Sequence, residues 1–333
     1  MTALQKERED VVFALARNLA RVSYEDIPAE VREVTKKSIL DTLGVAVAAS
    51  SLAPEVRELA ELIKEAGGKK ESTILGFGGK APAWMAALVN GALVHCLDYD
   101  DFYTEGRGHP GTATVPSGLA VAERLGRIGG KEFITAVALG NDLFCRLHLA
   151  IVASSFGLWH GTPLMGVFAA AATSGKLLGL NEGKMVDALG LAFCQAAGTR
   201  ALGWEVGSGI RGMYSAFPNQ GGVLAALMAQ RGIAGIKNSL EGRAGLFNAY
   251  FGGKYDREAL TADLGKRFEG GAVGFKPWPC CGAAHTHIDA TLSLIAQHDI
   301  KPQDVEEVTV FVDDFGRNLS QPLEARRKPA TPS

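Results

Sequence analysis

Apolar residues recur at helical spacing along most of the first 250 residues of the chain. The first stripe consists of Val12, Leu15, Ala16 and Leu19. A second stripe begins after Pro28, which suits the first turn of a helix, and consists of Val31, Val34 and Ile39. Apolar positions three and four residues apart are typical of amphipathic helices, so this part of the chain is predicted to be helical.

The second helix runs into Leu43–Ala49, where the sequence is apolar all round. A helix of that kind is expected to be buried on every side. A third helix is predicted to begin at Pro54 and to end at Gly67-Gly68. Ser72–Phe77 is a candidate short strand, and Trp84–Leu97 is predicted to be another buried helix.

The sequence after residue 97 is also predicted to be mainly helical, and it contains no internal repeat of fixed length. The predicted helices are Gly118–Leu125, Glu132–Leu149, Gly161–Leu178, Lys184–Ala197 and Gly221–Arg231. The chain has 41 glycines, and many of them lie at the joints between these helices or beside small-residue runs such as Ala169–Ser174. This composition favours helix backbones that approach one another closely.

The helical sequence pattern ends near Arg267. Pro277 and Pro279 are followed by a predicted helix at Thr286–Gln297 and by Val305–Val312, an alternating, valine-rich run typical of a strand. We therefore predict a large all-α domain at residues 1–267 and the start of a smaller α+β domain at residues 268–333. One helix and one strand cannot bury a sheet face, so the second domain is expected to be incomplete.

The composition of the chain excludes several classes of function. With 34 Lys+Arg against 36 Asp+Glu, the net charge is -2, which lacks the basic stripe expected for nucleic acid or an anionic membrane. No apolar stretch is long enough to predict a membrane span. The N-terminus has no apolar core of a secretory signal, and five irregularly spaced cysteines favour a reducing compartment, so a cytoplasmic protein is expected.

The densest polar cluster is His95-Cys-Leu-Asp98-Tyr99-Asp100-Asp101, followed by Gly108-His109-Pro110-Gly111. Three carboxylates directly after an apolar helix are costly to bury unless they are paired. A solvated helix end is one reading, and magnesium binding as in terpenoid synthases is another, although the second metal motif of those enzymes is missing. The third reading is metal-free acid–base chemistry by Asp98 and His109.

Two further segments carry candidate chemistry. His160 stands where a loop enters a predicted helix, a place that favours contact with anions, although a lone histidine is more often a core residue. Lys276 lies on a stiff loop between an aromatic residue and two prolines, where desolvation would lower its pKa. His285 and His287 follow Cys280-Cys281, but the spacing is poor for zinc, so no metal is predicted.

Five segments, in order, resemble the MmgE/PrpD family, which includes 2-methylcitrate dehydratase, cis-aconitate decarboxylase and iminodisuccinate epimerase. They are SILDTLGVA at 38–46, the cluster at 90–111, HGTPLMGVFAAAATSGKLLGL at 160–180, 210–242 and FKPWPCCGAAH at 275–285. The resemblance implies a large all-α domain with a smaller α+β lid, usually in a homodimer. It also implies a cleft that takes small di- or tricarboxylates, without a metal or other cofactor.

Carried over by position, the resemblance implies catalytic roles for Asp98, His109, His160 and Lys276. It implies substrate-binding roles for Arg211, Tyr214, Cys281 and His285. A polyanionic substrate needs fixed cations, which Arg211, Lys276 and a protonated His160 would supply. His109 is the expected proton donor or acceptor, with Asp98 orienting it.

The resemblance has departures. Asp100-Asp101-Phe102-Tyr103 stands where members often have Asp-Asp-Thr-His, and Arg211 replaces a frequent lysine. We predict a metal-independent hydro-lyase for an acid such as 2-methylcitrate of propionate metabolism. A decarboxylase or epimerase of a related dicarboxylate is an alternative, and so is an inactive helical scaffold. Members are usually longer, so we expect a shortened lid with exposed apolar surface.

Overall fold

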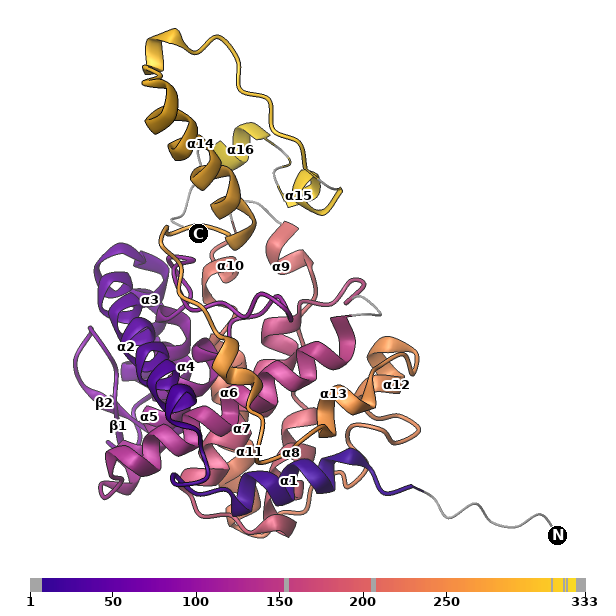
Figure 1. The fold of residues 1–333 in the computed structure, drawn as a ribbon. Coiled ribbons are helices and arrows are strands. Elements are labelled where there is room, and N and C mark those ends of the chain that lie inside the picture. The colour runs from indigo at the N-terminus through magenta and orange to yellow at the C-terminus, as the bar shows by residue number, and fades with distance from the viewer. Residues whose placement is uncertain are drawn as a thin grey trace, which may run out of the picture.

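The computed structural model describes residues 8–152, 156–204, 208–312, 314–319, 321 and 323–327, and it confirms a mainly α-helical fold (Figure 1). The helices of the first half are α1 (Val11–Arg21), α2 (Ala29–Leu52), α3 (Pro54–Ala66), α4 (Ala83–Leu93), α5 (Gly111–Leu125) and α6 (Gly130–Val152). The second half contains α7 (Gly161–Leu177), α8 (Glu182–Phe193), α9 (Ala201–Trp204), α10 (Ile210–Met213), α11 (Ala216–Gln230), α12 (Leu246–Phe251), α13 (Arg257–Thr261), α14 (His285–His298), α15 (Asp314–Leu319) and α16 (Leu323–Arg327). Three short 3₁₀ helices are η1 (Glu269–Ala272), η2 (Gly282–Ala284) and η3 (Pro302–Asp304).

Several helices begin and end where the sequence predicts. The Asp10 side chain accepts a hydrogen bond from the Val12 N–H at 2.9 Å and caps α1. Pro54 stands in the first turn of α3, and Gly67, with a φ of 69°, ends it. The predicted strand at Ser72–Phe77 is shorter: β1 (Ser72–Thr73) pairs with β2 (Lys80–Ala81) in a two-stranded antiparallel hairpin.

The core is built around α7. Nearly every residue of α7 is buried, and α5, α6, α8 and α11 pack around it. Small residues on both helices allow α7 and α11 to approach closely. A Cβ added to Gly222 of α11 would overlap Ala170 of α7. His160 is therefore held at the mouth of a rigid bundle, since it is the N-cap residue of α7.

Helix α6 is long and apolar enough to cross a membrane, and so is the bent pair α2–α3 by length and composition. The most apolar window of α6 is 89% buried inside the protein, and a core helix of a soluble protein has the same property. In the fold, α6 is a core helix that packs against α7.

The prediction that Leu43–Ala49 is buried on every side is wrong. Val45, Ala46 and Ala49 are buried, but Val47 is 68% exposed, and Leu40 on the preceding turn is 73% exposed. Apolar composition alone cannot show which faces of a helix have neighbours. One face of α2 packs on the helical body and the other carries apolar side chains at the surface.

The C-terminal part projects from the helical body (Figure 1). It contains α14, but the predicted strand at Val305–Val312 is irregular backbone, so the β component of the expected α+β lid is not seen in the described part of this segment. A strand needs a neighbouring edge for its backbone hydrogen bonds, and the described residues offer it none. Apolar side chains are exposed here, as expected: Val308 is 71% and Phe311 is 91% accessible.

Candidate active site

The loop between α4 and α5, residues 94–110, carries most of the candidate residues. Helix α4 ends at Leu93, and Asp98 has a left-handed φ of 48°, so the acidic run turns out of the helix instead of continuing it. Phe102 and Gly274 exchange two backbone hydrogen bonds of 2.9 Å. This bridge brings the segment that contains Lys276 against the loop.

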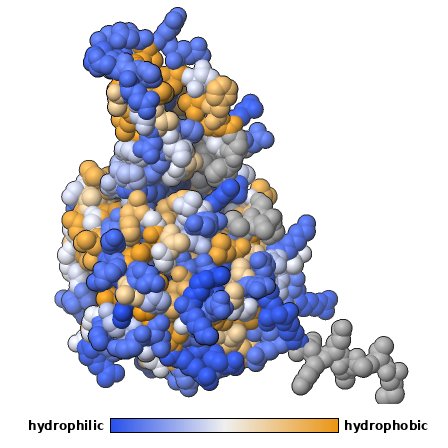
Figure 2. All heavy atoms as spheres, in the orientation of Figure 1, coloured by the Kyte–Doolittle hydropathy of each residue, from blue (hydrophilic) through white to orange (hydrophobic). Residues whose placement is uncertain are grey.

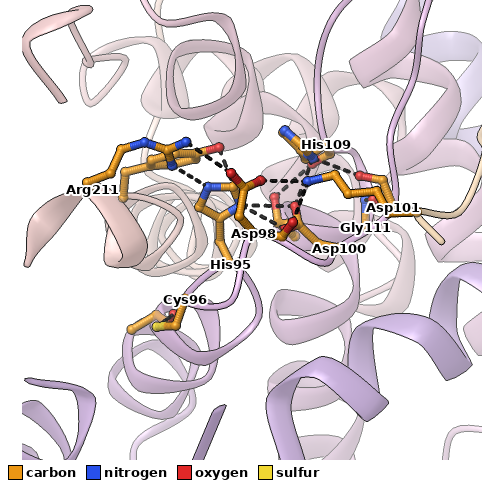
Figure 3. Close-up of polar contacts among 12 residues, drawn as sticks. His95, Cys96, Asp98, Asp100, Asp101, His109, Gly111 and Arg211 are labelled. Carbon is orange, nitrogen blue, oxygen red and sulfur yellow. Dashed lines mark hydrogen bonds and ion pairs between the residues drawn. The ribbon is translucent and has the colours of Figure 1, made fainter. Parts of the chain in front are cut away.

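Asp100 lies at the centre of the loop between two imidazoles (Figure 3). Its carboxylate is 3.0 Å from His95 Nδ1 and 2.8 Å from His109 Nδ1. His109 Nδ1 is also 2.8 Å from the Asp101 carbonyl oxygen. Both partners of His109 Nδ1 are acceptors, so this nitrogen carries the proton and donates. The other nitrogen, Nε2, is then the one available for chemistry.

Asp100 is an ionised carboxylate. Burial acts to raise its pKa, but the adjacent His109 and His95 rings outweigh burial and hold the pKa well below its ordinary value. A buried anion that accepts the Nδ1 proton of His109 stabilises the imidazolium form of that ring. The pair therefore has the arrangement of an acid–base dyad.

Arg211 of α10 fixes the second histidine. Its guanidinium donates to His95 Nε2 at 2.8 Å and lies 3.4 Å from an Asp98 oxygen (Figure 3). Because Nε2 accepts this bond, His95 carries its proton on Nδ1, where it faces Asp100. Burial lowers the pKa of His95, so the ring is neutral and serves to connect Asp100 with Arg211.

Lys276 pairs with Asp98. Its ammonium is 2.6 Å from the Asp98 carboxylate and 2.7 Å from the Asp98 carbonyl oxygen. The sequence-based expectation of a lowered lysine pKa is wrong. Burial acts to lower the pKa of Lys276, but Asp100 and Asp98 outweigh it and the pKa is raised. Lys276 is a fixed cation, which cannot accept a proton at ordinary pH.

His160 is neutral. Burial, followed by the nearby charge of Arg211, holds its pKa well below the ordinary value. The expected protonated His160 is therefore replaced by a neutral imidazole, which cannot act as a cation. Its ring lies 4.6 Å from the Tyr214 ring, and its Nδ1 is buried without a hydrogen-bond partner in the described structure. Such an orphaned nitrogen is costly to bury, unless a ligand completes it.

These groups meet at a cavity of about 520 Å³ between the helical body and the C-terminal part. Its lining consists of Asp98, Phe102, Thr104, Arg107, His109, His160, Thr162, Arg211, Tyr214, Cys281, Gly282, Ala283, His287, Phe311, Val312 and Gly316. Six of the eight candidate residues line it. Lys276 lies behind Asp98, and His287 lines the cavity where His285 was expected.

A second layer of carboxyl groups supports the loop. Asp101 is fully buried and accepts hydrogen bonds from Ser38 Oγ at 2.5 Å and from the Gly111 N–H at 3.0 Å. Burial raises the pKa of Asp101 to about 7, and burial together with Asp100 raises that of Asp41 to about 6. Asp101 thus holds the start of α5 and, through its carbonyl, the His109 ring.

Comparison with known proteins shows the family of this chain. A model of the MmgE/PrpD N-terminal domain matches residues 14–258, about three quarters of the chain. The chain belongs to the MmgE/PrpD family. A cis-aconitate decarboxylase of Aspergillus terreus is 30% identical over 291 residues, which cover 84% of this chain and 58% of that protein. The human cis-aconitate decarboxylase is 29% identical, over 81% of this chain and 57% of that protein.

A third MmgE/PrpD relative, the cis-aconitate decarboxylase-like protein oryM of Aspergillus oryzae, is 28% identical over 86% of this chain and 61% of its own length. The chain therefore spans about three fifths of the curated relatives that it matches. Two of these relatives are named as decarboxylases and the third as decarboxylase-like. The site described above lies mostly within the matched region.

The MmgE/PrpD site also contains a set of groups that could hold a metal ion. Ligand atoms of His95, Asp100 and His109 lie within 4.8 Å of one another. To ligate through Nδ1, however, His95 would have to move its proton to Nε2, which already accepts from Arg211 at 2.8 Å. The hydrogen bonds therefore fit a dyad better than a metal centre.

Sequence reasoning missed two residues of this MmgE/PrpD site. Asp100, and not Asp98, contacts His109, while Asp98 pairs with Lys276 and Arg211. His95 belongs to the polar cluster without a role assigned from sequence, and in the structure its Nδ1 bonds to Asp100. The sequence offered one indication. Asp98 and Asp100 are two residues apart on a loop, and two such side chains can face different partners.

Proposed function

We propose that this chain is a lyase that acts on a small di- or tricarboxylic acid by moving a proton at a carbon next to a carboxylate. One observation carries the proposal: His109, paired with Asp100, faces one cavity together with Arg211 and the neutral His160, whose Nδ1 lacks a hydrogen-bond partner among the described residues. Two imidazoles in different protonation environments beside a fixed cation suit proton transfer on an anion. The proposal uses no metal or cofactor.

Arg211 is proposed to hold the carboxylate next to the reacting carbon. It is partly exposed to the cavity, and a guanidinium can bind a carboxylate through two parallel hydrogen bonds. Negative charge that develops on the carbon spreads into this carboxylate. Arg211 stabilises that charge, and Lys276 adds a second positive charge behind Asp98.

His109 is proposed to transfer the proton through Nε2, because Asp100 stabilises its charged form. His160 is the candidate partner on the same cavity, since its free Nδ1 can accept a proton or a hydrogen bond. Tyr214 packs against both His95 and His160 and keeps the rings apart.

Decarboxylation is the first reaction to test, because relatives about 30% identical carry the name cis-aconitate decarboxylase. In such a step the bond to the departing carboxyl breaks and carbon dioxide leaves. Its electron pair stays on the conjugated acid, and the His109 imidazolium delivers a proton to carbon. Dehydration of a hydroxy acid such as 2-methylcitrate is the second candidate: one imidazole removes the carbon proton and the other protonates the leaving hydroxyl.

Proton NMR of the purified protein with cis-aconitate, citrate or 2-methylcitrate tests the proposal. We expect one acid to be consumed. Decarboxylation in heavy water places deuterium in the product next to a carboxylate, whereas dehydration releases the carbon proton to solvent and gives an unlabelled alkene product. A folded protein that neither binds nor converts any of these acids contradicts the proposal. Binding without conversion would favour the scaffold alternative.

We also propose that the chain forms a homodimer, as its resemblance to the family implies. The exposed apolar residues Leu40 and Val47 on α2 are consistent with association. Sedimentation velocity checks this point, and a single species at the monomer mass over the micromolar range would contradict it.

A further inference from the structure

We infer that His148 of α6 is a positioning residue that sets the separation of His109 and His160, because its ring supports the backbone beside each of them. The inference rests on the proposed function, in which these two imidazoles transfer protons at one cavity. His148 itself is fully buried and does not line that cavity. It can therefore act on the reaction only through the residues that it holds in place.

The ring of His148 is fixed within the helical body. Its Nδ1 donates to the Phe144 carbonyl oxygen, one turn earlier in α6, at 2.9 Å. The ring stacks on Phe144, with 4.0 Å between ring centroids, and Phe156 lies on it at 5.3 Å. Burial lowers the pKa of His148 to about 3, so the ring is neutral. One hydrogen bond and two aromatic neighbours hold the ring in a single orientation.

The Nε2 end of this ring lies against two glycines, each of which adjoins a proposed catalytic histidine. Gly108 precedes His109, and Gly161 follows His160. A Cβ added to either glycine would lie 2.7 Å from Nε2 of His148, which is closer than such atoms can approach. Both backbones therefore pack on the same ring atom, and a shift of the ring would move both histidines.

Two phenylalanine rings complete this support, but they divide the task between them. A Cβ added to Gly108 would also lie 2.7 Å from Phe144, whereas one added to Gly161 would lie 2.8 Å from Phe156. Among the nearest atoms to the two glycines, His148 is the residue that both share. Its ring is thus the spacer common to the two segments.

The choice of an imidazole at position 148 fits a spacer. Nε2 of His148 is buried without a hydrogen-bond partner among the described residues, and such an unpaired nitrogen costs the folded state free energy. A phenyl ring would avoid that cost, but it extends further, toward two glycines that leave no room even for a methyl group. The shorter ring matches the space between the two segments.

Steady-state kinetics of His148→Ala and His148→Gln test the inference, with Leu147→Ala as the matched control. Leu147 is an equally buried neighbour on α6 that is not among the nearest atoms to either glycine. We expect His148→Ala to lower kcat by about 10²-fold and to leave KM within about twofold, because a small misplacement of reacting groups has that effect. Glutamine reaches about as far as Nε2, so His148→Gln should recover about tenfold of the lost kcat.

Leu147→Ala should lower the urea midpoint at least as much as His148→Ala, because it also leaves a cavity, yet keep kcat within about twofold of the wild type. A kcat for His148→Ala that equals that of Leu147→Ala overturns the inference. If His148→Ala does not fold, a kcat for His148→Gln equal to that of the wild type overturns it instead, and a loss of about tenfold supports it.

Crystal structures of His148→Ala and Leu147→Ala give a readout that does not depend on turnover. We expect the segments of His109 and His160 to move in His148→Ala and to stay in place in Leu147→Ala. Unmoved histidines in His148→Ala overturn the positioning role, even where the wild type is inactive. A wild type that converts none of the acids overturns the proposed function, and the two structures still decide whether His148 positions the histidines.

Discussion

Asp100 is the residue on which the acid–base arrangement depends, because it is the shared acceptor of His95 and His109. Its neighbours force this role. Both histidines present a protonated Nδ1 to it, and the fully buried carboxylate has no access to water. An uncharged amide of the same shape would keep the packing but would not stabilise an imidazolium at His109.

Asp100→Asn is expected to lower kcat by about 10²-fold or more, with a much smaller effect on KM, because the loss falls on proton transfer. Steady-state kinetics with the acid that NMR identifies measure both constants. Asp289→Asn, the same change at an exposed position on α14, should leave both unchanged. A kcat for Asp100→Asn within a factor of two of the wild type would exclude the dyad from the mechanism.

The raised pKa of Asp101 predicts how the free energy of unfolding depends on pH. Its pKa is raised to about 7 in the folded protein, whereas an exposed aspartate titrates near 3.8. Between these values the unfolded chain loses its proton first, so the group costs the folded state increasing stability as pH rises from about 4 to 7. Asp101→Asn stays uncharged and does not carry this cost.

The free energy of unfolding of Asp101→Asn, relative to the wild type, should therefore rise between pH 4.5 and pH 7.5. Denaturant titrations at several pH values measure it. The wild type is the reference at each pH, so other titrating groups cancel. A difference that is constant or falls over this range would show that Asp101 is ionised in the folded protein at low pH.

At the scale of elements, the bounds of the helices can be predicted from the sequence, whereas the contacts within the site cannot. Periodicity and end signals such as Pro54 and Gly67 are local, so α3 could be predicted closely. The pairing of Lys276 with Asp98 depends on the Phe102–Gly274 bridge, across more than 170 residues, and spacing cannot indicate it. Sequence could name the loop that carries the chemistry, whereas the partners within it required the fold.

Arg146 of α6 holds the segment after α13 against the helical body through hydrogen bonds, and we call these contacts the clip. The side chain is fully buried, bonds to Asp142 at 2.9 Å, and donates to the carbonyl oxygens of Ala262 at 2.9 Å and Arg267 at 2.6 Å. This segment leads into η1 and then to Lys276, so the Arg146 contacts also support the position of Lys276.

Arg146→Met should destabilise the protein by about 3–5 kcal/mol, because it leaves Asp142 buried without its charge partner and orphans two carbonyl groups. Urea denaturation followed by circular dichroism gives the value. Arg127→Met, at an exposed arginine, should change stability by less than about 0.5 kcal/mol. A small loss for Arg146→Met would show that the clip is not needed to hold the segment.

At the scale of the whole molecule, the two parts of the chain differ in burial. The described residues of the helical body form three clusters of buried apolar side chains, while α14 contains no buried residue and its Leu292 and Leu294 are each 51% exposed. Figure 2 shows apolar surface on the part that projects from the body. The C-terminal part, from Cys281 onward, contributes Cys281, His287 and Phe311 to the cavity, and none of its described residues is buried. The C-terminal part thus lines the site, whereas the buried core residues that the structure describes lie in the body.

Replacing Val308 and Leu292 by serine should thus reduce the binding of an apolar fluorescent dye and leave the unfolding free energy within about 0.5 kcal/mol of the wild type. Neither side chain lines the cavity, so substrate binding should also persist. Dye fluorescence and urea denaturation on the same samples separate the two effects. Val12→Ser in α1, at a fully buried core position, is the matched control and should lower stability strongly. A comparable loss for the C-terminal pair would show that these apolar residues are covered in solution.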